Sequence, residues 1–278
     1  MQRRDTAWAG LQAGPQVMGI VNVTPDSFSD GGRSVEQAIA LGMQMLEDGA
    51  AIIDVGGEST RPGALTVSAV EEQRRVLPVI EALVRQGATV SVDTRNASTM
   101  ERALEKGAAI VNDVSGLTFD PASVATVARG HCAVILMHMR GTPETMDTLA
   151  IYGDVATEVL DELRHRVDQA LDGGVARSAI AIDPGFGFAK NTPQNVELLR
   201  GLSLFVNLSC PIIAGVSRKR FIGQLADITR AEDRDVASVA AGLFAVTQGA
   251  SVLRVHNVHA MVQALRVWTA VRQEAEPV

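Results

Sequence analysis

The sequence predicts an α/β protein of the (β/α)8 or TIM-barrel type. Three observations predict it: eight short apolar runs recur, helix-like segments separate them, and polar residues gather at the C-terminal ends of the runs. The length of 278 residues suits such a barrel, which commonly occupies about 250 residues as a single domain. We therefore expect one domain over residues 1–278, with a core of about 16–273.

The apolar runs are rich in β-branched residues and nearly continuous, which is typical of parallel strands covered on both faces. In chain order they are QVMGIVNV from Gln16, AIIDVGG from Ala51, ATVSVDT from Ala88, AAIVNDVSG from Ala108, AVILMHM from Ala133, AIAIDPG from Ala179, PIIAGVS from Pro211 and SVLRVH from Ser251. An open doubly wound sheet usually has fewer strands, so eight runs favour a closed barrel.

Segments with helical spacing of apolar residues lie between the runs. Clear examples span residues 34–50, 68–88 and 157–174. They end in Gly-Ala or Gly-Gly, as a helix does when glycine takes the left-handed conformation at its C-terminus. We expect each strand to be followed by one helix.

Composition excludes several classes of protein. The formal net charge of −7 argues against a general nucleic-acid binder, which needs a clustered basic surface. Cys132 and Cys210 each begin an apolar run and form no C-x-x-C pair, so we expect reduced core thiols in a reducing compartment. No signal peptide and no apolar run of about 20 residues is apparent, which predicts a cytoplasmic protein without a membrane span.

Polar residues at the ends of the predicted strands indicate where chemistry occurs, because barrel enzymes place it at the C-terminal face. From the first strand to the last, these residues are Asn22; Asp93 and Thr94; Asn112 and Asp113; His138; Asp183; Ser217, Arg218 and Lys219; Arg254 and His256. We expect them to converge at one mouth of the barrel.

Asp93, Asn112 and Asp183 form the first chemical set. Such groups are costly to bury without a partner. A flat heterocycle with adjacent N–H and NH2 donors, such as a pterin or guanine edge, would satisfy them. Alternatively, each residue caps a neighbouring helix or pairs with a barrel lysine.

The second set is cationic and consists of Arg61, Lys219, Arg254 and His256. Arg254 and His256 alternate with one residue between them, so both project from one face of the last strand. Such a cluster suits a phosphate or diphosphate, and Asn22 offers a neutral oxygen for Mg2+.

The remaining histidines do not indicate a zinc site. His131, His165 and His259 are expected at the surface, and His138 has no metal-like partner spacing.

Two loops of residues 24–34 and 58–66 are rich in Gly, Pro, Ser and Asp. They are either ordinary surface loops or, at the catalytic face of a barrel, lids over the site.

The ordered motifs resemble those of one enzyme family. They are MGIVNVTPDSFSDGG from Met18, IIDVGGESTRPG from Ile52, SVDT from Ser91, VNDVSG from Val111, LMHM from Leu136, DPGFGFAK from Asp183, GVSRKRFIGQL from Gly215 and RVH from Arg254. Over roughly Val17 to Val271 the chain resembles the dihydropteroate synthases. The resemblance implies condensation of 6-hydroxymethyl-7,8-dihydropterin diphosphate with p-aminobenzoate, with Mg2+ as cofactor and a homodimeric state.

The resemblance also implies a role for each site residue. The pterin would be held by Asp93, Asn112, Asp183 and Lys219, with Met137 lining its slot. The Mg2+–diphosphate would contact Asn22, Arg254, His256, Thr60 and Arg61. The p-aminobenzoate pocket, which sulfonamides also occupy in this family, would be bordered by Phe28, Pro62, Phe188 and Lys219.

One position departs from many members of the family. They carry serine directly after the S-R-K motif, where it helps to receive the aminobenzoate carboxylate, whereas this chain has Arg220. We therefore expect the carboxylate to be received by a helix N-terminus beginning near Ser217.

Two rival functions use the same barrel. A pterin-binding methyltransferase domain shares the carboxylates, but a methyl donor has no diphosphate for the cationic set to hold. A non-catalytic pterin-binding paralogue would be expected to lose some of the loop residues or the Arg254 and His256 pair, all of which are present.

Overall fold

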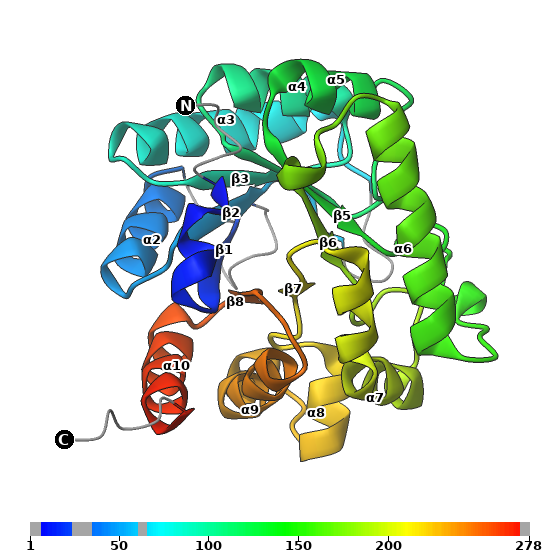
Figure 1. The fold of residues 1–278 in the computed structure, drawn as a ribbon. Helices are drawn as coiled ribbons and strands as arrows, with labels where there is room; N and C mark the ends of the chain where they lie inside the picture. Colours follow the sequence, from blue (N-terminus) through cyan, green and yellow to red (C-terminus); the bar gives the residue numbers. More distant parts are fainter. Residues whose placement is uncertain (1–6, 24–34, 61–65, 273–278) are drawn as a thin grey trace.

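The computed structural model describes residues 7–23, 35–60 and 66–272. Eight parallel strands form one sheet in the order β6-β5-β4-β3-β2-β1-β8-β7. The two edge strands meet through a parallel bridge between Ile182 and Ile212, which closes the sheet into a barrel. Helices surround the strands on the outside (Figure 1). The predicted (β/α)8 class is confirmed.

The strands are β1 (Gln16–Asn22), β2 (Ile52–Gly56), β3 (Val90–Asp93), β4 (Ile110–Asp113), β5 (Ala133–Met137), β6 (Ile180–Asp183), β7 (Ile213–Ala214) and β8 (Val252–Val255). The α-helices are α2 (Val35–Glu47), α3 (Ala69–Arg85), α4 (Ala97–Glu105), α5 (Ser123–Gly130), α6 (Val155–Asp172), α7 (Thr192–Arg200), α8 (Arg220–Ala226), α9 (Asp235–Thr247) and α10 (Val258–Arg272). Short 3-10 helices are η1 (Ala9–Ala13), η3 (Met146–Leu149), η4 (Arg177–Ala179), η5 (Leu202–Leu208) and η6 (Ala231–Arg234).

Local sequence signals explain where the long helices begin and end. Ser68 caps α3 by accepting a hydrogen bond from the backbone N–H of Glu71, and Asp154 caps α6 in the same way. After α3, Gly87 has a φ of +83°, and after α6, Gly174 has a φ of +91°. These are the left-handed glycines predicted from the sequence.

The strands bury both faces, as their continuous apolar character predicts. Outward-facing side chains such as Val55, Val92 and Val111 pack beneath the helices in the larger core. Inward-facing side chains fill the barrel in a separate apolar cluster, whose strand members are Met18, Ile52, Ile110, Ala133, Ile135, Ala181, Ile213 and Val252. Two residues further along β2, β4, β6 and β8, the inward positions are occupied by the polar residues Asp54, Asn112, Asp183 and Arg254.

The seventh repeat differs from the expected strand and single helix. We predicted a strand from Pro211 with Ser217 at its end, but β7 contains only Ile213 and Ala214. Two α-helices, α8 and α9, then precede β8 instead of one. Residues 215–219 therefore form a connection at the barrel mouth, where Arg218 takes a left-handed φ of +57°.

No helix in the described ranges is long and apolar enough to span a membrane. Cys132 and Cys210 are both buried and neither forms a disulfide.

Candidate active site

Four polar side chains from different strands meet inside the barrel, above its apolar filling. Asp54 Oδ2 accepts hydrogen bonds from Arg254 Nε at 2.6 Å and from Asn112 Nδ2 at 3.0 Å. Arg254 Nη2 donates to Asp93 Oδ2 at 2.7 Å. Asp93 thus has Arg254 as its partner, and Asn112 has Asp54. Neither residue caps a helix or pairs with a lysine through these bonds, as the alternative interpretation had proposed.

Asp54 is the member of this group that the sequence analysis missed. It lies in the middle of β2 and has no exposed surface. Its Oδ1 has no hydrogen-bond partner among the described residues. The available signal was a carboxylate inside the apolar run IIDVG, because a buried acid needs compensation from a partner or ligand.

The carboxylates of Asp54 and Asp93 share the guanidinium of Arg254, and this arrangement affects the pKa of Asp93 and of Arg254. Burial raises the pKa of Asp93 to about 7; the charge of Arg254 opposes this shift and that of Asp54 reinforces it. Burial alone would lower the pKa of Arg254, but the two carboxylates outweigh it and raise the pKa. Asp54 Oδ1 has no hydrogen-bond partner among the described residues, so the group keeps an acceptor oxygen for a ligand that presents N–H donors.

Asp183 ends β6 and lies at the same mouth. Its Oδ1 accepts from the backbone N–H of Gly185 at 2.7 Å, and only 5% of the residue is exposed. Burial raises its pKa, while the charges of Lys219 and Arg254 act in the opposite direction. The acidic and cationic sets are thus close enough to interact, as expected for the two ends of one ligand.

Lys219 and Phe188 form one wall of the site. The Nζ of Lys219 lies 4.1 Å from the centre of the Phe188 ring, within the range of a cation–π contact. Phe188 also packs with Met137 in a small apolar cluster. A side chain at Gly187 would lie 3.1 Å from Lys219 Cδ, so glycine permits the close approach of the lysine stem.

His256 follows β8 and is oriented by Ser217. The backbone N–H of His256 donates to Ser217 Oγ at 3.1 Å, and Ser217 Oγ lies 3.0 Å from His256 Nδ1. If the serine hydroxyl donates to Nδ1, the neutral imidazole carries its proton on Nε2. That tautomer presents an N–H donor suited to an anion.

The helix expected to begin near Ser217 begins three residues later. Helix α8 begins at Arg220, with Lys219 as its N-cap residue and no side-chain cap. Ser217 precedes the helix and its hydroxyl contacts His256, so it offers no helical N–H groups. Arg220 itself is exposed in the first turn of α8.

Asn22 lies at the mouth beside Asp93. A Cβ placed on Gly56 would lie 3.6 Å from both Asn22 Oδ1 and Asp93 Oδ2, so the two oxygens flank this glycine. Thr60, the last of the described residues 35–60, is half-buried. The predicted residues Phe28, Arg61 and Pro62 lie outside the described residues.

Other polar residues at the strand ends do not join the site. Asp113 turns back and accepts from Ser115 and from the backbone N–H of Leu117. Arg218 pairs with Asp235 at 2.6 Å. The exposed histidines are His131, His165 and His259, as predicted.

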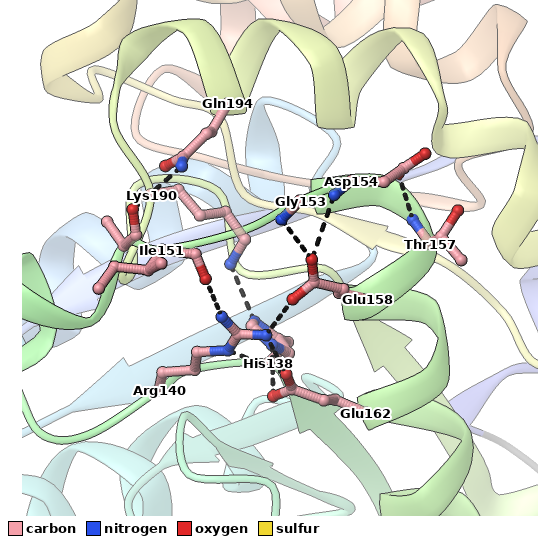
Figure 2. A network of polar contacts seen from close by, with 11 residues as sticks. His138, Arg140, Ile151, Gly153, Asp154, Thr157, Glu158, Glu162, Lys190 and Gln194 are labelled. Carbon is pink, nitrogen blue, oxygen red and sulfur yellow. Dashed lines mark hydrogen bonds and ion pairs between the residues drawn. The ribbon is translucent and has the colours of Figure 1, made fainter.

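His138 follows β5 directly, and its ring is held between a carboxylate and a lysine (Figure 2). Nε2 lies 3.0 Å from Glu162 Oε2, and Nδ1 lies 2.9 Å from Lys190 Nζ. Burial and the charge of Lys190 lower the pKa of His138 to about 4, although Glu162 acts in the opposite direction.

We expect the His138 ring to remain neutral throughout the pH range 5 to 8, in which an ordinary histidine titrates. The unfolded chain, with a histidine pKa of 6.5, takes up the proton first on acidification. His138 therefore contributes stability that is present above pH 6.5 and is lost as the pH falls toward about 4, on the order of 3 kcal/mol. Ring chemical shifts measured by NMR check this, and a midpoint near 6.5 would contradict it.

Comparison with known proteins adds independent evidence. Residues 18–256 match the family of pterin-binding enzymes. The chain is 45% identical to the dihydropteroate synthase of Synechocystis sp. over 254 residues, covering 90% of this chain and 88% of that protein. It is also similar to two solved dihydropteroate synthases. The Xanthomonas albilineans structure with 4-aminobenzoic acid has 48% identity, 94% coverage of each chain and a TM-score of 0.89. The Yersinia pestis structure with a sulfonamide drug has 41% identity, coverage of 93% and 94%, and a TM-score of 0.89.

Proposed function

The chain belongs to the family of pterin-binding enzymes and is a transferase with dihydropteroate synthase activity, and from that premise we propose how its site performs the reaction. The enzyme condenses 6-hydroxymethyl-7,8-dihydropterin diphosphate with p-aminobenzoate and releases pyrophosphate. The observation that carries our assignment of the site is the polar group inside the barrel. There Arg254 joins Asp54 to Asp93, and Asp183 stands at the same mouth.

The pterin edge is placed against the carboxylates. Asp183 and Asp93 are acceptors in a buried setting, where hydrogen bonds to N–H and NH2 donors are stronger than in water. Asn112 is oriented by its bond to Asp54 and completes this surface. Met137 lines the slot beside Phe188.

We propose that the diphosphate end binds near His256, Lys219 and Thr60. Arg61, which lies outside the described residues, is assigned to the diphosphate by the family resemblance alone. The guanidinium of Arg254 has five N–H donors, of which the bonds to Asp54 and Asp93 use two. Arg254 therefore orients Asp54 and Asp93, next to the proposed pterin site, and has further N–H groups that can donate to the phosphate. We propose that the p-aminobenzoate ring binds beside Phe188 and Lys219, with Arg220 near its carboxylate. Phe28 and Pro62, which lie outside the described residues, are assigned to this pocket by the family resemblance alone.

We propose that bond breaking precedes attack. The C–O bond between the pterin methylene and the diphosphate breaks with its electron pair on the departing oxygen. The neutral aromatic amine then forms the C–N bond and loses a proton to water, so no strong general base is needed. Lys219 and His256 stabilise charge on the leaving group more in the transition state than in the ground state, which is the condition for faster chemistry.

The residues present fit a magnesium ion held mainly by the substrate. In the described ranges, no cluster of three or more His, Cys, Asp or Glu side chains forms a metal site. Asn22 Oδ1, which flanks Gly56 with Asp93 Oδ2, would supply one oxygen to the ion. This suits Mg2+, which commonly takes few protein ligands and completes its shell with phosphates and water. When bound, Mg2+ neutralises charge that develops on the diphosphate.

Pyrophosphate release tests the function. Mixing the protein with both substrates and Mg2+ should yield one pyrophosphate per dihydropteroate, and chelation of Mg2+ should suppress the reaction. A pterin-binding methyltransferase would release no pyrophosphate, and a non-catalytic paralogue would bind the pterin without forming product. Sulfonamides should compete with p-aminobenzoate, as supported by the similar Yersinia pestis enzyme with a sulfonamide drug.

A homodimer is proposed through α9. The apolar face of α3 is fully buried at Val76, Val79 and Ile80. On α9, by contrast, Val236 is 84% exposed and Phe244 is 42% exposed. We expect sedimentation equilibrium to give about twice the chain mass of 29.4 kDa.

Substitution tests the dimer surface. Phe244→Glu should yield the single-chain mass, because a charge would be buried at the contact. Val70→Glu on α3 is the matched control, since Val70 is 78% exposed and lies outside the proposed surface. A dimer unaffected by Phe244→Glu would exclude this face.

We also propose a cytoplasmic location, supported by the two buried thiols of Cys132 and Cys210.

A further inference from the structure

Lys190 is a buried lysine to which the proposed chemistry gives no role. It ends the loop 184–190 that joins β6 to α7, and only 5% of it is exposed. Its Nζ contacts three acceptors: Gly185 O at 3.0 Å, Phe188 O at 2.9 Å and His138 Nδ1 at 2.9 Å. A lysine ammonium has three donors, so this arrangement uses them all.

The surrounding hydrogen bonds determine where the proton of the His138 ring lies. Arg140 binds the Glu162 carboxylate through Nε at 2.9 Å (Figure 2). Arg140 also stacks on the ring of Tyr152. Burial would raise the pKa of Glu162, but the bonds from His138 and Arg140 outweigh it and lower the pKa to about 2. The His138 proton therefore lies on Nε2, facing the carboxylate, and Nδ1 accepts from Lys190.

The backbone of the loop is shaped around this ammonium. Gly185 and Gly187 have φ values of +71° and +77°, and Ala189 has a φ of +48°. A Cβ on Gly185 would lie 1.9 Å from the backbone oxygen of His138, so no larger residue fits. These turns direct two carbonyl groups inward to the same Nζ, which donates to both. Burial lowers the pKa of Lys190 to about 7, while the charges of Asp183 and Glu162 favour its protonated form.

Asp183, assigned to the pterin, and Phe188, assigned to p-aminobenzoate, lie at and beyond the end of β6. Their backbones are held in different ways. Asp183 belongs to β6 and pairs in register with Met137 of β5, so the sheet holds its backbone. Phe188 lies beyond the last residue of the strand, and its carbonyl is one of the groups that Lys190 binds. Its ring faces Lys219 in the wall assigned to the aromatic amine.

We propose that Lys190 is a positioning residue that fixes Phe188 and thereby sets the affinity of the enzyme for p-aminobenzoate. His138 contacts the lysine through Nδ1 and is itself held by Glu162 at Nε2. The inference rests on the proposed function of the site. It predicts a selective effect, because the sheet holds the backbone of Asp183, whereas the backbone of Phe188 bonds directly to the lysine. The carboxylate of Asp183 is linked to the lysine only indirectly, through Gly185.

Lys190→Met tests this by removing the amine and its contacts to Gly185, Phe188 and His138 while retaining a similar length. We expect KM for p-aminobenzoate to rise by at least about tenfold, since misplacement of a binding group by an ångström has effects of this order or larger. The Kd for the pterin diphosphate should rise by a smaller factor than this KM, because Lys190 reaches Asp183 only through the backbone of Gly185. Lys106→Met is the matched control, because Lys106 lies on the surface and pairs only with Glu81 among the described contacts.

Substitution of His138 provides a second test should Lys190→Met fold poorly. Asn at position 138 can place its amide oxygen near the former Nδ1 and still accept from Lys190, whereas Leu cannot. His138→Asn should therefore keep KM for p-aminobenzoate near the wild-type value, and His138→Leu should raise it as Lys190→Met does.

The two possible failures are distinguishable. If the wild-type protein releases no pyrophosphate, the proposed function fails. If the wild type is active but Lys190→Met and His138→Leu reduce only kcat or the folded fraction, with KM for p-aminobenzoate unchanged, Lys190 has a merely structural role and the inference is overturned.

Discussion

Replacing Arg254 with methionine is expected to reduce kcat/KM by at least about 100-fold and to destabilise the fold by about 3–5 kcal/mol. The guanidinium joins Asp54, which has no exposed surface, to Asp93, whose side chain is only 10% exposed. Without it, two carboxylates remain close together inside the barrel without their cation. They would take up protons, and a protonated Asp93 would be a poorer acceptor for the pterin.

Steady-state kinetics and chemical denaturation of the same preparation measure both effects. Arg254→Lys keeps the charge but not the planar fork that reaches two carboxylates, so we expect an intermediate loss. Arg74→Met serves as the control, because the Arg74 side chain is 74% exposed. Wild-type kinetics and stability in Arg254→Met would show that Arg254 supports neither the carboxylates nor the diphosphate.

Asp183→Asn should have a comparable or larger effect on catalysis with little effect on stability. The amide oxygen of asparagine can still accept from the backbone N–H of Gly185, so the turn after β6 is retained. The other carboxylate oxygen, however, becomes an NH2 donor facing the donors of the pterin. Loss of charge-assisted hydrogen bonds in a buried site should lower kcat/KM by about 100- to 10,000-fold.

The fold of this variant is checked by its thermal unfolding, which should match that of the wild type. Asp161→Asn is the control, because the Asp161 side chain is 60% exposed on α6. Kinetics within about threefold of the wild type in Asp183→Asn would mean that the pterin is recognised elsewhere.

The sequence was sufficient to predict the barrel because the signals of the fold are local. Apolar runs, capping residues and terminal glycines each act within a few residues, and α3 and α6 begin and end where these signals place them. The length of the seventh strand was predicted wrongly, because an apolar run indicates that residues are buried but not that they form hydrogen bonds with a neighbouring strand. Val216 is buried without belonging to β7.

The site was only partly predictable for a related reason. Polar residues at the ends of strands were visible as a pattern, but the partner of each one depends on the closure of the barrel. Arg254 and Asp54 are 200 residues apart in the chain and 2.6 Å apart in the structure. Asp54 was overlooked because it lies within a strand and not at its end. Lys190 was overlooked because nothing in GFGFAK indicates that the lysine turns inward.

Binding of the two halves of the pterin substrate, measured by calorimetry, tests most directly whether opposite sides of the mouth hold opposite ends of one ligand. Asp183→Asn should weaken binding of the hydroxymethyl-dihydropterin by at least about 100-fold while pyrophosphate with Mg2+ binds as in the wild type. His256→Phe should show the reverse pattern. Equal weakening of both halves by either substitution, or of neither, would contradict the division of the site into an acidic pterin end and a cationic diphosphate end.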